Sequence, residues 1–124
     1  MTGKVTQALD SGDESTLERT RWKGESAFQG YVMAFDKPEM HKAIRSLKAL
    51  CEAATPPLTM QEASLRWIIH HSALQDGDAI IFGAKALDQL ESNVIEARRG
   101  PLSNEIVNAL QDMWETIQSD TEKL

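Results

Sequence analysis

The residues best suited to chemistry follow a short apolar run, A-I-I-F at residues 79–82. The run is continuous rather than alternating, which predicts a strand buried on both faces and ended by Gly83. A glycine there lets a ligand approach the backbone, and the first N–H groups of a following helix favour an anion such as a phosphate. Lys85 adds a positive charge, while Gln89 and Asn93, four residues apart, share one helical face. The pattern fits a phosphate-binding turn, but taken alone it more often marks a purely structural turn with a solvated lysine.

Other reactive side chains favour structural roles. His70 and His71 are adjacent, and neighbouring helical residues point about 100° apart, so they do not chelate one ion. We expect no metal site, with one of these histidines packed and the other exposed. His41 is expected on a helix surface, in contact with solvent. Cys51 falls on an apolar stripe, which predicts a buried thiol rather than a nucleophile.

The elements that must position these residues are mostly helices, because apolar residues recur at spacings of three and four. Pro38 fits a first helical turn, and Thr59 with Glu62 forms a capping-box pair that starts another helix. We expect about four helices between residues 38 and 120. The first ends before Pro56, and the second ends near His71 or Leu74. The third contains Leu87 to Ala97 and stops at Gly100, and the fourth starts at about Ser103. Residues 1–20 are polar and turn-rich, which predicts a flexible loop. Residues 21–33 are expected to form an irregular, aromatic-anchored segment.

The composition is that of a single domain over residues 1–124, with 41% hydrophobic residues available for a core. The net charge of -6 and the pI near 5.0 argue against nucleic acid or an anionic membrane as partner. No apolar run approaches the roughly 18 residues of a membrane span. The N-terminus lacks the apolar core of a signal peptide, and the single cysteine fits a reducing compartment. We therefore expect a cytoplasmic protein.

A longer pattern surrounds the apolar run. Gly83, Ala84, Gln89 and Asn93 read G-A-x-x-x-x-Q-x-x-x-N, preceded by L-R-W-x-x-x-H-S from Leu65 and followed by G-P-L at 100–102. This pattern resembles the C-terminal part of the aldo/keto reductases, most of all their aflatoxin-aldehyde-reductase branch. Residues 21–22 and 31–38 resemble fungal members of that branch. Residues 1–4, M-T-G-K, resemble the L-T-G-K that follows the family's seventh barrel strand.

The resemblance implies a (β/α)8 barrel that reduces aldehydes or ketones by hydride transfer from NADPH. A complete barrel takes about 250 residues, so this chain is expected to be a partial barrel, either a truncated gene product or a fragment. On its own it should be mostly α-helical, with only the eighth strand, at 79–82. The family's catalytic Asp, Tyr, Lys and His lie in earlier strands, and none of their motifs occurs here. No residue of this chain is therefore assigned as catalytic.

The resemblance also implies contacts with NADP(H). It places the adenosine 2′-phosphate at the turn formed by Gly83, Ala84 and Lys85. It places the adenine and its ribose on the helix, at Gln89 and Asn93. The pyrophosphate would lie near the N-terminus, at Lys4. Relatives carry serines at positions 85 and 86, so the hydrogen bonds to the phosphate differ here.

Three functions remain open from the sequence. The chain is the C-terminal segment of an NADP-dependent aldo/keto reductase, acting on a small carbonyl substrate when the rest of the barrel is supplied. Alternatively, it is an inactive derivative that serves as a binding or interaction protein. A third alternative is a repurposed, nicotinamide-independent catalyst in a biosynthetic pathway. An unpaired strand and an apolar helix at 65–69 predict self-association or a partner chain.

Overall fold

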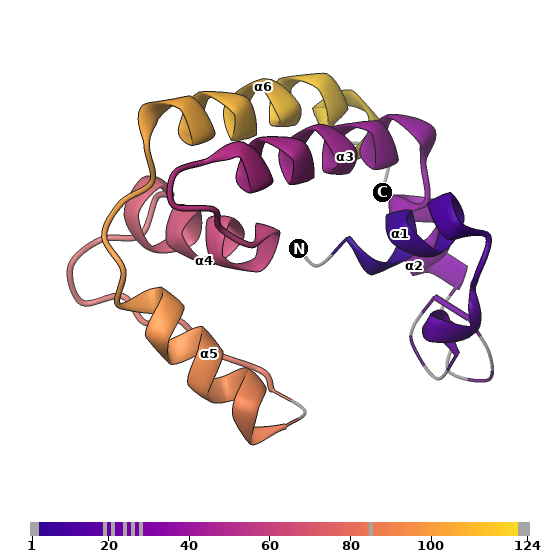
Figure 1. Cartoon of the computed structure of the whole chain (residues 1–124), viewed down its shortest axis with the longest axis horizontal. Coiled ribbons are helices and arrows are strands. Elements are labelled where there is room, and N and C mark those ends of the chain that lie inside the picture. The colour runs from indigo at the N-terminus through magenta and orange to yellow at the C-terminus, as the bar shows by residue number, and fades with distance from the viewer. Residues whose placement is uncertain are drawn as a thin grey trace.

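The chain is built from helices joined by turns and extended connections (Figure 1). A computed structural model describes residues 3–18, 20, 22–23, 25, 27, 29–84 and 86–121. These residues contain one short 3-10 helix and six α-helices: α1 (Lys4–Ser11), η1 (Ser15–Leu17), α2 (Gln29–Phe35), α3 (Pro38–Ala53), α4 (Met60–His71), α5 (Leu87–Ala97) and α6 (Asn104–Thr121). The prediction of a mostly helical chain is confirmed.

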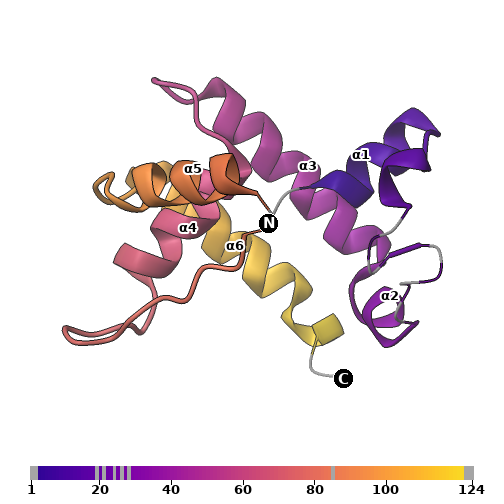
Figure 2. The same cartoon turned by 90° about the horizontal axis from the view of Figure 1, so that it is seen from below.

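The core lies where α3, α4 and α6 meet. Helices α3 and α6 pack along each other, and α4 contacts both (Figures 1 and 2). The apolar stripes of these helices face inward and form one cluster of buried side chains: Leu47, Cys51, Ala63, Leu102, Ile106 and Leu110. Helix α5 packs on α4 at one end of the molecule, and α1 packs on α3 towards the other (Figure 1). Because α4 is held in the core by α3 and α6, it provides the surface on which α5 packs.

The predicted helix starts are present. Pro38 occupies the first turn of α3, where its missing N–H removes no intrahelical bond. Thr59 caps α4, and its Oγ1 accepts a hydrogen bond from the Glu62 backbone N–H at 3.0 Å. The four helices expected between residues 38 and 120 correspond to α3, α4, α5 and α6.

The predicted strand at 79–82 is wrong. None of its residues is in a strand, and the β-type pairing among the described residues is an isolated bridge between Thr20 and Lys23. Ile81 is 96% exposed, so the run is not buried on both faces. A strand is held by backbone bonds to a neighbour, and the part of the chain that the structure describes brings no second strand beside 79–82.

The N-terminal region is more ordered than the sequence suggested. We predicted a loop over residues 1–20, but Lys4–Ser11 forms α1, bounded by Gly3 and Gly12 in left-handed conformations. Part of the segment expected to be irregular forms α2. In the described residues no helix is both long enough and apolar enough to cross a membrane.

His41 explains how α1 is held. It is 6% exposed, so the expectation of a solvated histidine is wrong. Its Nδ1 lies 2.9 Å from the Thr6 Oγ1 on α1, and its Nε2 lies 2.7 Å from the Asp36 Oδ1 that precedes α3. One imidazole therefore joins three segments. Together with the ion pair between Arg45 of α3 and Asp10 of α1 at 2.6 Å, this contact holds a helix that is too short to be stable alone.

Candidate functional site

The residues singled out on α5 belong to a longer polar face. Gln89, Ser92, Asn93 and Glu96 are spaced at i, i+3, i+4 and i+7, so they share one side of the helix. Gln89 is exposed, whereas Asn93 is buried and its Oδ1 accepts a hydrogen bond from the Gln61 Nε2 of α4 at 2.7 Å. The structure thus anchors Asn93 on α4 and leaves Gln89 exposed.

The turn before α5 is open to solvent. Gly83 and Ala84 are both exposed, and Lys85 lies outside the described residues. The N-cap residue Ala86 provides no side-chain hydrogen bond to the first turn of α5. Asp88 in that turn accepts a hydrogen bond from the Gln89 backbone N–H at 2.8 Å. In the residues described, the helix start is therefore accessible to solvent, and the Asp88 carboxylate occupies part of its first turn.

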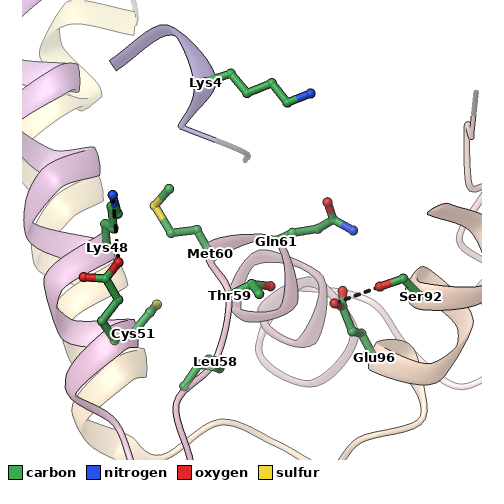
Figure 3. Close-up of a pocket in the computed structure, with 10 residues that line it drawn as sticks. Lys4, Lys48, Cys51, Leu58, Thr59, Met60, Gln61, Ser92 and Glu96 are labelled. Atoms are coloured by element: carbon green, nitrogen blue, oxygen red, sulfur yellow. Dashed lines mark hydrogen bonds and ion pairs between the residues drawn. The ribbon is translucent and has the colours of Figure 1, made fainter. Parts of the chain in front are cut away.

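Lys4 approaches this region from a different part of the chain. A cleft of about 510 Å³ separates the start of α1 from α3, α4 and α5, and its wall contains Lys4, Lys48, Cys51, Glu52, Leu58, Thr59, Met60, Gln61, Ser92 and Glu96 (Figure 3). Lys4 extends over the opening that Gln61, Ser92 and Glu96 border (Figure 3). The structure therefore brings Lys4 to the polar face of α5, although the two lie more than 80 residues apart.

Charge is unevenly distributed in the cleft. Lys48 pairs with Glu52 at 3.8 Å, while Lys4 forms no ion pair with any residue that the structure describes. Ser92 Oγ donates to the Glu96 Oε1 at 3.2 Å. A cation at one side and a carboxylate at the other suit a ligand that has an anionic group and a hydrogen-bond donor.

Cys51 lines the same cleft but has the properties of a core residue. It is 1% exposed and packs in the apolar cluster, so the prediction of a buried thiol is confirmed. Burial raises the pKa of the Cys51 thiol above its usual value of 9.0, and the nearby carboxylates of Glu52 and Glu62 raise it further. A thiol that stays protonated is a poor nucleophile.

The two adjacent histidines hold a turn. His70 Nε2 lies 2.8 Å from the carbonyl oxygen of Arg99, and the Leu102 backbone N–H donates to His71 Nε2 at 3.0 Å. His71 is half-buried and His70 exposed, as predicted. Both side chains fix the connection between α5 and α6 against α4.

Sequence reasoning missed Gln61, Ser92 and Glu96. Ser92 and Glu96 could have been found from helical spacing, because they lie on the same face of the helix as Gln89 and Asn93. Gln61 carries no comparable signal, since its role depends on how α4 meets α5. Lys4 was assigned by resemblance, and the structure places it beside these residues.

Comparison with known proteins gives several relatives. The chain is 36% identical over 103 residues to aldo-keto reductase family 7 member A3 of Homo sapiens, a match that covers 82% of this chain and 28% of that protein. It is 37% identical over 103 residues to aflatoxin B1 aldehyde reductase member 2 of Homo sapiens, covering 78% and 28%. An aldo-keto reductase of Pseudocercospora fijiensis is 39% identical over 66 residues, covering 52% and 22%. No protein-family model matches the chain.

These matches span only 22–28% of the length of the three relatives. They extend over most of this chain in the two human proteins, and both carry names of the group that the motifs around Gly83 and Asn93 predicted. The chain therefore matches part of an aldo-keto reductase, of the branch that includes the aflatoxin B1 aldehyde reductases.

Proposed function

We propose that this chain supplies the adenosine-phosphate part of an NADP(H) site in an aldo-keto reductase. The observation that carries the proposal is the meeting of Lys4 with the polar face of α5 across one cleft. The family resemblance assigns Lys4 and the α5 residues Gln89 and Asn93 to the same cofactor. The cleft itself is lined by Lys4 and by Ser92 and Glu96, which lie on the same side of α5 as that pair. If the turn before α5 were purely structural, there would be no reason for Lys4, which forms no ion pair with the described residues, to lie over the polar face of α5.

The residues present fit the chemistry of the cofactor. A phosphate is favoured by the exposed start of α5, where Gly83 and Ala84 leave the backbone accessible, and by the charge of Lys85. The exposed Gln89 would meet the base or ribose, whereas the buried Asn93, whose Oδ1 accepts a hydrogen bond from Gln61, would hold this face of α5 in position. Lys4 would face the pyrophosphate. When bound, NADPH supplies the hydride for carbonyl reduction.

The chemical step needs catalytic residues, and none has been assigned in this chain. The proposed contribution is binding and orientation of the adenosine end, together with part of the wall around the carbonyl substrate. Hydride transfer to an aldehyde or ketone would take place only when the rest of an aldo-keto reductase is supplied. We therefore expect the chain alone to bind NADPH weakly and to oxidise none in the presence of an aldehyde, since half a site gives up much of the affinity.

A second candidate function is that of an interaction protein, and exposed apolar side chains favour it. Ile81, Leu87 and Ile95 are 96%, 70% and 60% exposed, and they lie on or just before α5. Apolar surface left in water favours association with another polypeptide. Under this function the cleft would be a remnant, and binding of a partner would not depend on nucleotide.

Nucleotide titration separates the two functions. NADPH and NADH are titrated into the folded chain and followed by nucleotide fluorescence, beside the variants Lys85→Ala and Lys42→Ala. We expect binding that prefers NADPH and weakens about tenfold in Lys85→Ala, the effect of losing one charge-assisted hydrogen bond. Lys42→Ala, which removes an exposed charge from α3, should bind as the unaltered chain does. Equal binding of NADPH and NADH, or none, would contradict the proposal.

A further inference from the structure

Glu96 has a feature that the folded chain itself does not explain. Its side chain is only 8% exposed, and its Oε2 has no hydrogen-bond partner in the part of the chain that the structure describes. A buried carboxylate oxygen without a partner is costly, and such atoms are rare in native proteins. The missing partner is therefore expected to come from outside the described part of the chain.

The position of Glu96 indicates where that partner lies. The residue is in the wall of the cleft, one turn beyond Ser92 on the polar face of α5 (Figure 3). Ser92 Oγ donates to Oε1 at 3.2 Å, which holds the carboxylate and leaves Oε2 as the unsatisfied atom. The terminal torsion of glutamate is soft, so a small rotation presents this oxygen to the cleft.

The chemistry of the partner follows from the charge. An ionised carboxylate only accepts hydrogen bonds, so the missing group is an N–H or O–H donor. Lys4 on the opposite side of the opening favours an anion. A ligand that satisfies both has a phosphate at one end and a donor at the other, which describes an adenine nucleotide with its exocyclic amino group.

We propose that Glu96 recognises the 6-amino group of adenine and makes the cleft selective for adenine over hypoxanthine. This inference rests on the proposed function, because it takes the adenosine phosphate as the ligand. Hypoxanthine has a carbonyl oxygen where adenine has the amino group. It would place one acceptor against another and leave Oε2 unsatisfied, and such a mismatch is how a polar site rejects the wrong ligand.

The test uses the full chain and two dinucleotides, NADPH and its analogue with hypoxanthine in place of adenine. Calorimetry on the unaltered chain should show NADPH binding about tenfold or more tightly, the discrimination of one charge-assisted hydrogen bond. In Glu96→Gln the amide can donate to the hypoxanthine oxygen, so the preference should fall to near one. Glu91→Gln, an exposed glutamate on the same helix, should keep the preference of the unaltered chain.

The outcomes distinguish this inference from the proposed function. If NADPH and the hypoxanthine analogue bind equally to the unaltered chain, while NADPH is still preferred over NADH, the role of Glu96 is overturned and the phosphate site stands. A preference for adenine that persists in a folded Glu96→Gln variant also overturns it. If the folded chain binds no NADPH, the proposed function fails, and the assignment of Glu96 fails with it.

Discussion

The Arg99 guanidinium at the end of α5 lies 2.6 Å from the buried carboxylate of Glu62 in the first turn of α4. The other carboxylate oxygen of Glu62 accepts from Arg66 at 2.8 Å, so both oxygens are satisfied. Arg66 in turn donates to the carbonyl oxygens of Gly100 and Pro101. This network holds the end of α5 on α4, and it thereby sets the position of the cleft wall that carries Glu96.

Removing the charge of Glu62 should therefore destabilise the fold. We expect Glu62→Gln to lower the free energy of unfolding by about 1–3 kcal/mol, the range for hydrogen bonds to charged groups. Urea unfolding measures the change. Glu52→Gln is the matched control, since Glu52 pairs with Lys48 at 3.8 Å on the exposed surface of α3. Its effect should stay below about 0.5 kcal/mol, and equal effects of the two variants would contradict the role of the network.

Alanine substitutions at the two glycines that flank α1 allow the cost of backbone strain to be measured apart from the cost of crowding. Gly3 and Gly12 have φ values of 66° and 69°, so alanine at either position should cost about 1–2 kcal/mol of stability. A Cβ at Gly3 would also clash with the Met60 Cε, whereas a Cβ at Gly12 meets nothing within 4 Å. Gly3→Ala should exceed Gly12→Ala by up to about 1 kcal/mol, because Met60 must change its rotamer.

A double-mutant cycle checks that explanation. In a Met60→Ala background the excess cost of Gly3→Ala should disappear, while the cost of Gly12→Ala should not change. Thermal or urea unfolding of the three single variants, the two double variants and the unaltered chain gives the values. An excess that survives without the Met60 side chain would mean that crowding at the start of α4 is not its cause.

Stability should fall at alkaline pH because of Cys51. Its pKa is raised in the folded chain by burial, so the unfolded chain loses the thiol proton first, near pH 9.0. The stabilisation is fully present below that pH and is lost as the pH rises towards the folded pKa. Urea unfolding between pH 7 and pH 10 should show this decline, and Cys51→Ala should lessen it. An identical decline in the variant would assign it to other groups.

The exposed apolar residues beside the cleft predict association. Ile81 and Leu87 are 96% and 70% exposed, before and at the start of α5. We propose that they contact a second copy or a partner chain, and we expect the sedimentation coefficient to rise with protein concentration. Ile81→Lys should reduce that rise. Met33→Lys, at a 77% exposed position on α2, is the control and should leave it unchanged. A concentration-independent monomer would contradict this expectation.

The helices that pack the core were predictable because their signals are local. Thr59 caps α4, and the apolar spacing after Pro38 produces the stripe that is buried in α3. The strand at 79–82 failed for the opposite reason, since a strand depends on partners that a local run does not specify. Helix α1 was missed because it is held by residues 35 positions away in the sequence, through the contacts of Thr6 with His41 and of Asp10 with Arg45.

Some residues of the candidate site could likewise be predicted from the sequence, and others could not. Gln89 and Asn93 were predictable from spacing and resemblance, and Lys4 from resemblance alone. Glu96 was not, because what distinguishes it is a buried oxygen without a partner, a property of packing between helices and not of residue order. The contact of Asn93 with Gln61 likewise exists only once α5 lies on α4.

The link between Thr6 and His41 has a consequence for how firmly α1 stays attached. The ring of His41 is held at both nitrogens, by Asp36 at Nε2 and by Thr6 at Nδ1. Thr6 lies two residues after Lys4 in the same helix, so this contact limits how far the start of α1 can move from α3. The position of Lys4 at the cleft therefore depends on a histidine that does not itself line the cleft.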